Sequence, residues 1–153
     1  MLVEDFEDTN YIFTITSAGG WARNNSRAKT GSWSYKSAAI SHNATADAVI
    51  TVPAGALTVR FWYTVDSEPG YDFFRFKVGS TQQLEASGNV DWTQTPEYPL
   101  GAATQITFSY SKDGSGSNGA DAVWVDDVTF TMPLPHLVQP PRSVAALHRA
   151  SRW

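Results

Sequence analysis

The sequence contains no cysteine. Disulfide bonds, thiolate metal sites and cysteine nucleophiles are therefore excluded. No apolar stretch reaches the roughly 18 residues that a membrane-spanning helix needs. The first ten residues, MLVEDFEDTN, carry acids where a signal peptide has a basic segment and a long apolar run. We therefore predict a chain with no membrane span and no export signal of its own.

Charged residues are also few, at 17% of the 153 residues, and they are unevenly placed. Before Met132, fifteen acidic residues stand against eight basic ones, a formal charge of −7. From residue 133 onward the only charged side chains are Arg142, Arg149 and Arg152. Because an acidic body repels phosphate groups, we expect no nucleic-acid partner.

Sustained helical periodicity is missing before Met132, and short alternating runs recur between turn residues instead. In residues 57–66, LTVRFWYTVD, every second residue is apolar, which indicates a strand that covers a core on one face. Trp62 falls on the other face of this strand. Further strands are predicted at 72–78, 105–111 and 122–131, and less regular ones at 11–16, 33–40, 48–52, 81–86 and 91–98.

Two features of this pattern define the predicted domain. The apolar phase of 122–131 changes at Asp126 and Asp127, which predicts a β-bulge there. Many short strands with turns at regular spacing are typical of a sandwich or barrel. We predict an all-β fold for residues 1–132, a two-sheet antiparallel jelly-roll sandwich.

The composition changes at Pro133, and residues 133–153 are predicted to form a separate Pro-rich basic arm. Residues 132–141 hold four of the eight prolines, which keeps them out of a sheet interior and favours an extended chain. Ser143 is a suitable N-cap for a helix of one or two turns, which is too short to be stable alone. The arm is either disordered or docks on a partner through apolar and basic side chains, namely Leu147, Arg142, Arg149, Arg152 and Trp153.

Residues for catalysis do not form a known pattern. His42 lies in a polar segment, and His136 and His148 lie in the arm, so no imidazole is placed for a catalytic triad. No HExxH motif or glycine-rich phosphate loop is present. The acidic residues lie mainly at turns, where carboxylates are ordinarily solvated. We expect a protein that is not an enzyme.

Acidic residues at both ends of the domain suggest a calcium site. Four of them lie between residues 4 and 8, and Asp126 and Asp127 lie in the last strand. If the terminal strands are neighbours, these carboxylates converge, and carboxylate oxygens are the ligands that Ca²⁺ prefers. The candidate ligands are Glu7, Asp126 and Asp127. The alternative is that the carboxylates accept hydrogen bonds from backbone amides at the bulge, or are simply exposed.

Aromatic residues on polar strand faces form a second candidate site. Sugar rings present apolar C–H faces that stack on aromatic side chains, while polar neighbours bind the hydroxyl groups. The aromatic residues predicted to point outward are Trp62, Phe73, Trp92 and Trp124. The alternative for each one singly is that it covers a sheet edge or packs under a loop.

Several sequence blocks together resemble a known type of module. The blocks FWYTVDSEPGYDFFRFKVG, SGNVDWT and ITFSYSKDGSGSNGADAVWVDDVTF follow the opening LVEDFEDTN and a GSWSYKS element. Over residues 2–131 this order is similar to MAM-like and carbohydrate-binding-type sandwiches of bacterial secreted proteins and phage tail proteins. The resemblance implies a non-catalytic accessory module. It also implies that Glu7 and Asp127 match the positions at which some relatives hold a structural calcium ion.

The basic arm shifts the functional hypothesis toward a phage particle. A sandwich that begins on its first strand and ends in its own arm indicates a virion structural protein, either a capsid decoration protein or a minor tail protein. It would be assembled in the host cytoplasm, held on the virion surface by the arm through other virion proteins, and would allow a homo-oligomer. The alternative is an extracellular carbohydrate-binding module of a secreted bacterial protein, with glycans as partners.

Overall fold

A computed structural model describes residues 1–134, which form twelve β-strands and no helix. No part of the described chain therefore offers a helix able to cross a membrane. The strands in chain order are β1 (Leu2–Glu4), β2 (Thr14–Ser17), β3 (Ala22–Asn24), β4 (Ser34–Lys36), β5 (Thr45–Thr51), β6 (Thr58–Asp66), β7 (Phe73–Val78), β8 (Thr81–Ser87), β9 (Asn89–Gln94), β10 (Tyr98–Pro99), β11 (Gln105–Ser111) and β12 (Ala122–Thr131).

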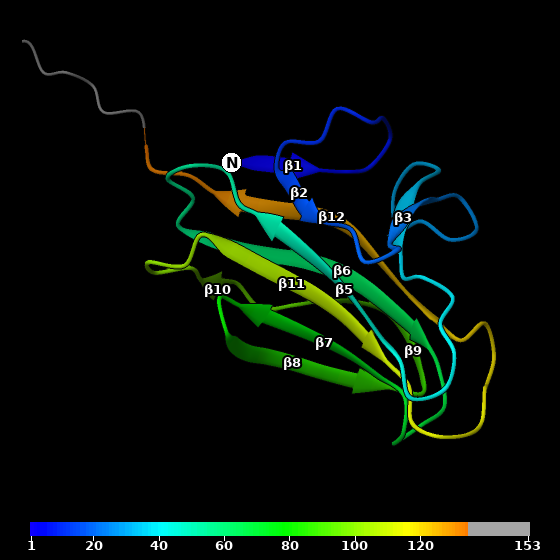
Figure 1. Ribbon diagram of the computed structural model, residues 1–153. Helices are drawn as coiled ribbons and strands as arrows, with labels where there is room; N and C mark the ends of the chain where they lie inside the picture. The colour runs from blue at the N-terminus through cyan, green and yellow to red at the C-terminus, as the bar shows by residue number, and fades with distance from the viewer. Residues whose placement is uncertain (135–153) are drawn as a thin grey trace, which may run out of the picture.

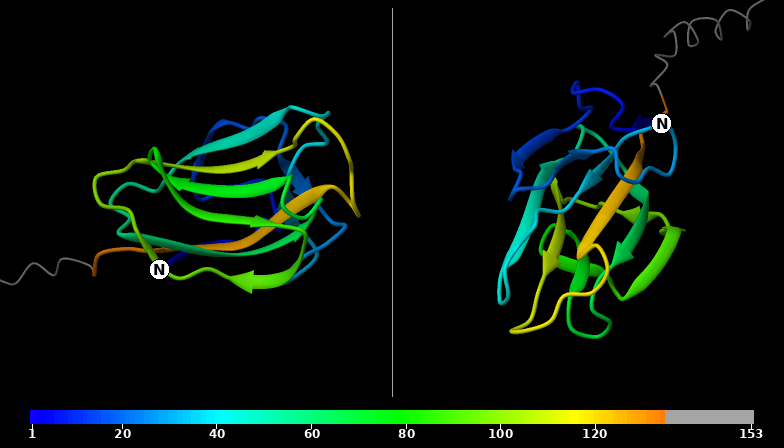
Figure 2. Two further views of the ribbon diagram at one scale, coloured as in Figure 1. Left: turned by 90° about the horizontal axis from the view of Figure 1, so that it is seen from below. Right: turned by 90° about the vertical axis from the view of Figure 1, so that its right-hand side faces the viewer.

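The strands form two antiparallel sheets that pack face to face (Figure 1; Figure 2, left). The five-stranded sheet has the order β2-β5-β11-β7-β8. The seven-stranded sheet has the order β10-β6-β12-β4-β3, with β1 also paired to β12 and β9 also paired to β6. The predicted all-β, two-sheet antiparallel jelly-roll sandwich is confirmed. From residue 135 on, the predicted arm and its docking residues Arg142, Leu147, Arg149, Arg152 and Trp153 lie outside the described residues.

The core between the sheets is rich in aromatic side chains. The predicted inward residues Val59, Phe61, Tyr63 and Val65 of β6 are all buried. Phe61 packs edge-on against Phe76 and Phe108 of the opposite sheet, at ring-centroid distances of 4.7 and 5.2 Å. Leu57 was expected on the same inward face, but it precedes β6 and is 50% exposed. The two-residue period thus identified the buried face of β6. Leu57, the first residue of that pattern, lies before the strand begins.

The predicted bulge in the last strand is confirmed. The pairing of β12 with β6 shifts register between Asp126 and Thr129, and Asp127 has a left-handed φ of 48°. The extra residue lets the valines and phenylalanine on both sides of the bulge face the core. On one side of the bulge β12 pairs with β4, and on the other it pairs with β1. The bulge is therefore where the N-terminal segment meets the last strand.

Several predicted strand bounds differ from the structure. The strand expected at 91–98 is divided into β9 and β10, because Pro96 cannot donate a backbone hydrogen bond to a neighbouring strand. The three-residue strand β3 was not predicted, since Ala22–Asn24 is too short to show alternation. Its partner β4 covers only residues 34–36 of the predicted 33–40. The residues between β3 and β4 form a loop over the outer face of the larger sheet, where it contacts Trp124, Asp126 and Asp127.

Candidate functional site on the outer face of the seven-stranded sheet

Three of the four predicted outward aromatic residues lie on adjacent strands of one sheet. Trp124 is on β12, Trp62 on its neighbour β6, and Trp92 on β9, which pairs with β6. None of the three belongs to the hydrophobic core cluster between the sheets. Phe73 is on β7 of the other sheet and does not join them.

The strand register brings Trp62 and Trp92 close together. Trp62 lies opposite Gln94, two residues beyond Trp92 on β9. Diagonal neighbours of this kind lie about 7–8 Å apart between Cα atoms, within reach of large aromatic side chains. A register irregularity also leaves Asp91 and Trp92 together facing the single residue Thr64.

Trp124 cannot offer its ring to a ligand, because it is only 1% exposed. The Arg27 guanidinium lies over the indole at 4.2 Å and the Lys36 ammonium at 5.3 Å. The indole Nε1 donates a hydrogen bond of 3.0 Å to Ser26 Oγ. The prediction that Trp124 binds a ligand is therefore wrong in this structure. The alternative, a tryptophan packed beneath a loop, describes it.

Trp62 and Trp92 are half-buried and remain accessible at the β9 edge. The exposed Lys29 places its ammonium 4.2 Å from the Trp62 ring. Asp91 and Gln94 are exposed beside the two indoles. We call this set, Trp62, Trp92, Lys29, Asp91 and Gln94, the tryptophan platform. It combines two large apolar ring surfaces with hydrogen-bond donors and acceptors, which is the chemistry that a sugar requires.

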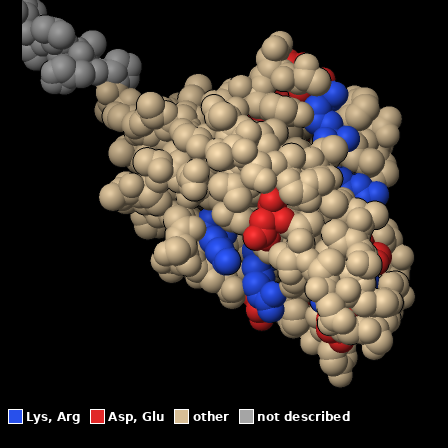
Figure 3. Space-filling view, viewed as in Figure 1, with Lys and Arg blue, Asp and Glu red and all other residues tan. Residues whose placement is uncertain are grey.

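Phe73 lies in a different setting, on the outer face of the five-stranded sheet. The Arg75 guanidinium stacks 4.6 Å from its ring and pairs with Glu85 at 2.8 Å and Ser111 at 2.9 Å. Figure 3 views this face and shows few charged side chains, several of them gathered near its middle. Phe73 is therefore separate from the predicted outward tryptophans, which lie on the other sheet.

The acidic residues Glu7, Asp126 and Asp127, which we call the acidic cluster, all bind the loop between β3 and β4. Asp126 Oδ2 accepts hydrogen bonds from the amides of Lys29 and Thr30, at 2.8 and 3.3 Å. Glu7 accepts from the amides of residues 32 and 33, and Asp127 from the hydroxyl of Thr30. The alternative that sequence offered, carboxylates bound to backbone amides at the bulge, thus describes Asp126 and Glu7.

The same residues are not drawn together into a tight ligand set. Among the described residues, the only three carboxylates with oxygens within 4.8 Å of one another are Glu68, Asp72 and Asp113. That group lies just beyond the C-terminal end of β6, beside the buried ammonium of Lys112, which binds Asp72. In this structure the acidic cluster therefore binds the loop between β3 and β4 through hydrogen bonds.

Burial perturbs the carboxyls at the bulge. Asp126 is completely buried, and burial together with the nearby Asp127 charge raises its pKa to about 7. Burial also raises the pKa of Asp127, with a further contribution from the charge of Asp5. Each carboxyl is thus easier to protonate in the fold than in the unfolded chain.

The stability of the domain in the presence of a chelator is expected to fall as the pH rises from about 5 to about 8. Because the pKa of Asp126 is about 7 in the fold against a usual 3.8, the folded state keeps a proton that the unfolded chain has lost in this window. Asp127→Asn removes the neighbouring charge, keeps an acceptor oxygen for Thr30, and suits the left-handed backbone at this position. Urea unfolding at the two pH values should show a smaller pH dependence in Asp127→Asn, and an unchanged dependence would contradict this account.

A buried lysine was not recognised from the sequence. Lys112 is buried, and its ammonium binds Asp72 at 3.0 Å and both carboxylate oxygens of Asp121 at 2.7 Å. It also binds Gly116 O and Ser117 Oγ, and so ties the glycine- and serine-rich loop to the sheet. The signal that identifies it is that Lys112 continues the inward phase of Phe108 and Tyr110.

Comparison with known proteins gives structural likeness only. No family model matches the chain, and no curated protein matches it. Among solved structures, the K2 cleaved adhesin domain of Lys-gingipain aligns with a TM-score of 0.51 at 17% identity, covering 86% of this chain and 98% of that one. The K3 cleaved adhesin domain of Lys-gingipain from Porphyromonas gingivalis gives 0.51 at 14% identity, covering 87% and 99%.

A weaker likeness connects the chain to a carbohydrate-binding module, TmCBM61 in complex with β-1,4-galactotriose. Its TM-score is 0.41 at 15% identity, over 79% of this chain and 87% of that one. At such a score a shared fold does not follow from the alignment. The TM-scores of the two gingipain domains are high enough to indicate a shared fold. Their sequence identities are too low to indicate a shared function. The chain thus shares the β-sandwich fold of the gingipain adhesin domains.

Proposed function

We propose that this domain is a non-catalytic glycan-binding module that acts outside the cell and binds its ligand on the tryptophan platform. The proposal depends chiefly on one observation. Trp62 and Trp92 lie outside the core on paired strands, half-buried and accessible, with Gln94 opposite Trp62. The fold shared with two domains named as adhesins agrees with binding rather than catalysis.

The virion hypothesis receives no support from the two gingipain adhesin domains whose fold this chain shares, neither of which is named as a phage protein. It depends on the basic arm, which lies outside the described residues from residue 135 on. The alternative derived from the sequence, an extracellular carbohydrate-binding module, depends on aromatic residues that the structure does describe. We therefore favour that alternative.

A screen of the natural chain against arrayed neutral and acidic oligosaccharides tests the proposal. We expect binding to at least one oligosaccharide, which is recovered unchanged after incubation with the protein. Loss of that binding in Trp62→Ala, with binding kept in Tyr71→Ala, would support the platform. Tyr71 is a matched control because it is an aromatic residue, 61% exposed, in the turn between β6 and β7 and not part of the tryptophan platform. An array without any bound oligosaccharide would count against the proposal.

We also propose that the acidic cluster holds a structural Ca²⁺ ion. The ligand types fit the ion, since Glu7, Asp126 and Asp127 supply hard carboxylate oxygens, and these oxygens would move closer together to bind it. Asp126 Oδ1, Glu7 Oε1 and both oxygens of Asp127 each accept a single hydrogen bond, so each keeps a lone pair for a cation. A bound cation would offset the repulsion between Asp126 and Asp127 that contributes to the raised pKa of Asp126.

Calcium is accordingly expected to raise the melting temperature of the domain at a pH of about 8, where both aspartates are ionised in its presence. The shift should be absent in Asp127→Asn, which loses a carboxylate but keeps the hydrogen bond from Thr30. Differential scanning calorimetry with calcium and with chelator measures the melting temperatures of the natural chain and of Asp127→Asn. Identical melting temperatures of the natural chain in the two conditions would exclude the ion.

A further inference from the structure

Two cations beside the tryptophan platform lack an anionic partner. Among the described residues, no carboxylate lies within ion-pair distance of Lys29 or Arg60. The other arginines of residues 1–134 each donate a hydrogen bond from the guanidinium, but Arg60 donates none to the described chain. Arg60 is half-buried and Lys29 is exposed. Both therefore present N–H donors at the surface that are free to bind an acceptor.

Both cations lie beside Trp62, on the face of the sheet that carries the platform. Arg60 precedes Trp62 by two residues on β6, so the two side chains point to the same face, about 6.6 Å apart along the strand. The Lys29 ammonium lies 4.2 Å from the centre of the Trp62 ring. The backbone of Lys29 is fixed by the loop between β3 and β4, because its amide donates to the buried Asp126 at 2.8 Å. Two positive charges are therefore held beside one indole.

The acidic residues of this face bind other groups. Glu97 accepts hydrogen bonds from two threonine hydroxyls, and Asp91 accepts one from the backbone amide of Trp92. Asp126 and Asp127 accept hydrogen bonds from the loop between β3 and β4. These carboxylates thus bind neutral donors, and the two cations are left for an anion that comes from outside the described chain.

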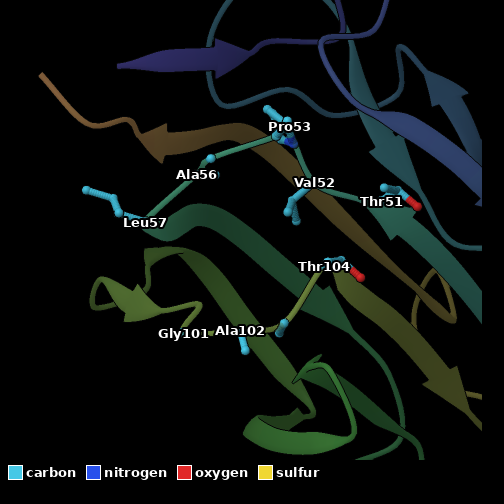
Figure 4. A pocket seen from close by; sticks show the side chains of 11 residues that line it. Thr51, Val52, Pro53, Ala56, Leu57, Gly101, Ala102 and Thr104 are labelled. Atoms are coloured by element: carbon cyan, nitrogen blue, oxygen red, sulfur yellow. The ribbon is translucent and has the colours of Figure 1, made fainter. Parts of the chain in front are cut away.

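An open groove elsewhere on the described domain does not offer such charges. It has a volume of about 430 Å³ and lies between residues 51–57 and residues 101–104 (Figure 4). Its lining includes Val52, Pro53, Ala56 and Ala102, and no charged side chain. An anion in this groove would lose part of its hydration without gaining a charged partner. The tryptophan platform is therefore the better surface for an acidic ligand.

We propose that the glycan bound by the tryptophan platform is an acidic one, and that Lys29 and Arg60 bind its carboxylate. This inference rests on the proposed function, since it names the class of sugar for the same surface. The Lys29 ammonium lies over the Trp62 ring, whereas no cation among the described residues lies over Trp92. The sugar ring therefore stacks on Trp92, and its carboxylate extends toward the cations beside Trp62. Charge-assisted hydrogen bonds are about twice as strong as those between neutral groups, so the charge of the sugar determines the affinity.

An array of matched oligosaccharides tests this inference. Each uronic acid oligosaccharide is arrayed beside its carboxyl-reduced form, in which a primary alcohol replaces each carboxylate. We expect the natural chain to bind at least one acidic oligosaccharide more tightly than its reduced form, by about tenfold or more. The preference should weaken as the salt concentration rises, because salt screens exposed charges.

Variants of the two cations assign the preference to this surface. Lys29→Gln and Arg60→Gln should each remove most of the preference for the acidic oligosaccharide, whereas Lys29→Arg should keep it. Both glutamine variants should keep the melting temperature of the natural chain, because neither side chain has an ion pair to lose in the described structure. Lys77→Gln is the matched control and should leave the preference unchanged, because Lys77 lies on β7 of the other sheet.

Two results would overturn the inference and leave the proposed function in place. Equal binding of the acidic and reduced oligosaccharides would show that the carboxylate is not recognised. An acidic preference that survives in both Lys29→Gln and Arg60→Gln would show that other groups bind the carboxylate. An array without any bound oligosaccharide would instead overturn the proposed function, and this inference with it.

Discussion

Replacing Lys112 by alanine is expected to destabilise the domain by about 3–5 kcal/mol, the usual result of removing one partner from a buried ion pair. The Lys112 and Asp72 side chains are 1% and 0% exposed, so water cannot solvate the aspartate once the ammonium is gone. Burial alone would lower the pKa of Lys112, but its hydrogen bonds to Asp121 and Asp72 raise it instead. The folded state therefore contains a charged lysine on which two carboxylates depend.

Urea unfolding of Lys112→Ala measures this loss, with Lys77→Ala as the matched control. Lys77 is a half-buried lysine on β7 without an ion pair in the described structure, and its replacement should change stability little. Adding Asp72→Asn to Lys112→Ala should recover part of the stability, because the unpaired buried charge is removed. A loss below about 1 kcal/mol in Lys112→Ala, as is typical of a surface ion pair, would show that the lysine is not buried in solution.

Trp62→Ala and Trp92→Ala are each expected to weaken glycan binding by tenfold or more. Truncation of a central aromatic residue in a binding site costs about 2 kcal/mol or more, which exceeds the 1.4 kcal/mol that corresponds to a tenfold change. Each variant removes one of the two accessible indoles of the tryptophan platform. Titration calorimetry with the oligosaccharide found by the array gives the affinity ratio.

Phe73→Ala provides the sharpest control for this prediction. The sequence predicted Phe73 as an outward ligand-binding aromatic residue together with the two tryptophans. In the structure it lies on the other sheet, beneath Arg75. Its replacement should leave the affinity unchanged. If Phe73→Ala abolishes binding while both tryptophan variants retain it, the site lies on the five-stranded sheet and the tryptophan platform is not the binding surface.

The fold could be predicted from the sequence largely because strand periodicity is a local signal. The inward and outward faces of β6 and the bulge at Asp126 and Asp127 follow from the spacing of apolar residues within one segment. The outward position of Trp62 follows from the same alternation. The boundary between β9 and β10 was missed although Pro96 marks it, since the alternation on each side disguised the break.

The site depended on contacts between residues far apart in the sequence, which periodicity does not reveal. Trp124 is covered by a loop whose Ser26 is 98 residues away. The buried carboxylate of Asp126 accepts the amide of Lys29, which is 97 residues away. The proximity of Trp62 and Trp92 required the pairing of β6 with β9 and its register. Only the continued inward phase of β11 offered a local signal for the burial of Lys112.

The indole resonances of the chain test most directly whether Trp62 and Trp92 form the binding surface. A ¹⁵N spectrum recorded with and without the bound oligosaccharide reports each tryptophan separately, and Trp21 and Trp124 serve as internal controls. Their Nε1 groups donate to Ala46 O and Ser26 Oγ, and both side chains are buried. We expect shifts of the Trp62 and Trp92 indoles and of the amides of residues 91–94. Shifts confined to β7 and β8, with both indoles unchanged, would contradict it.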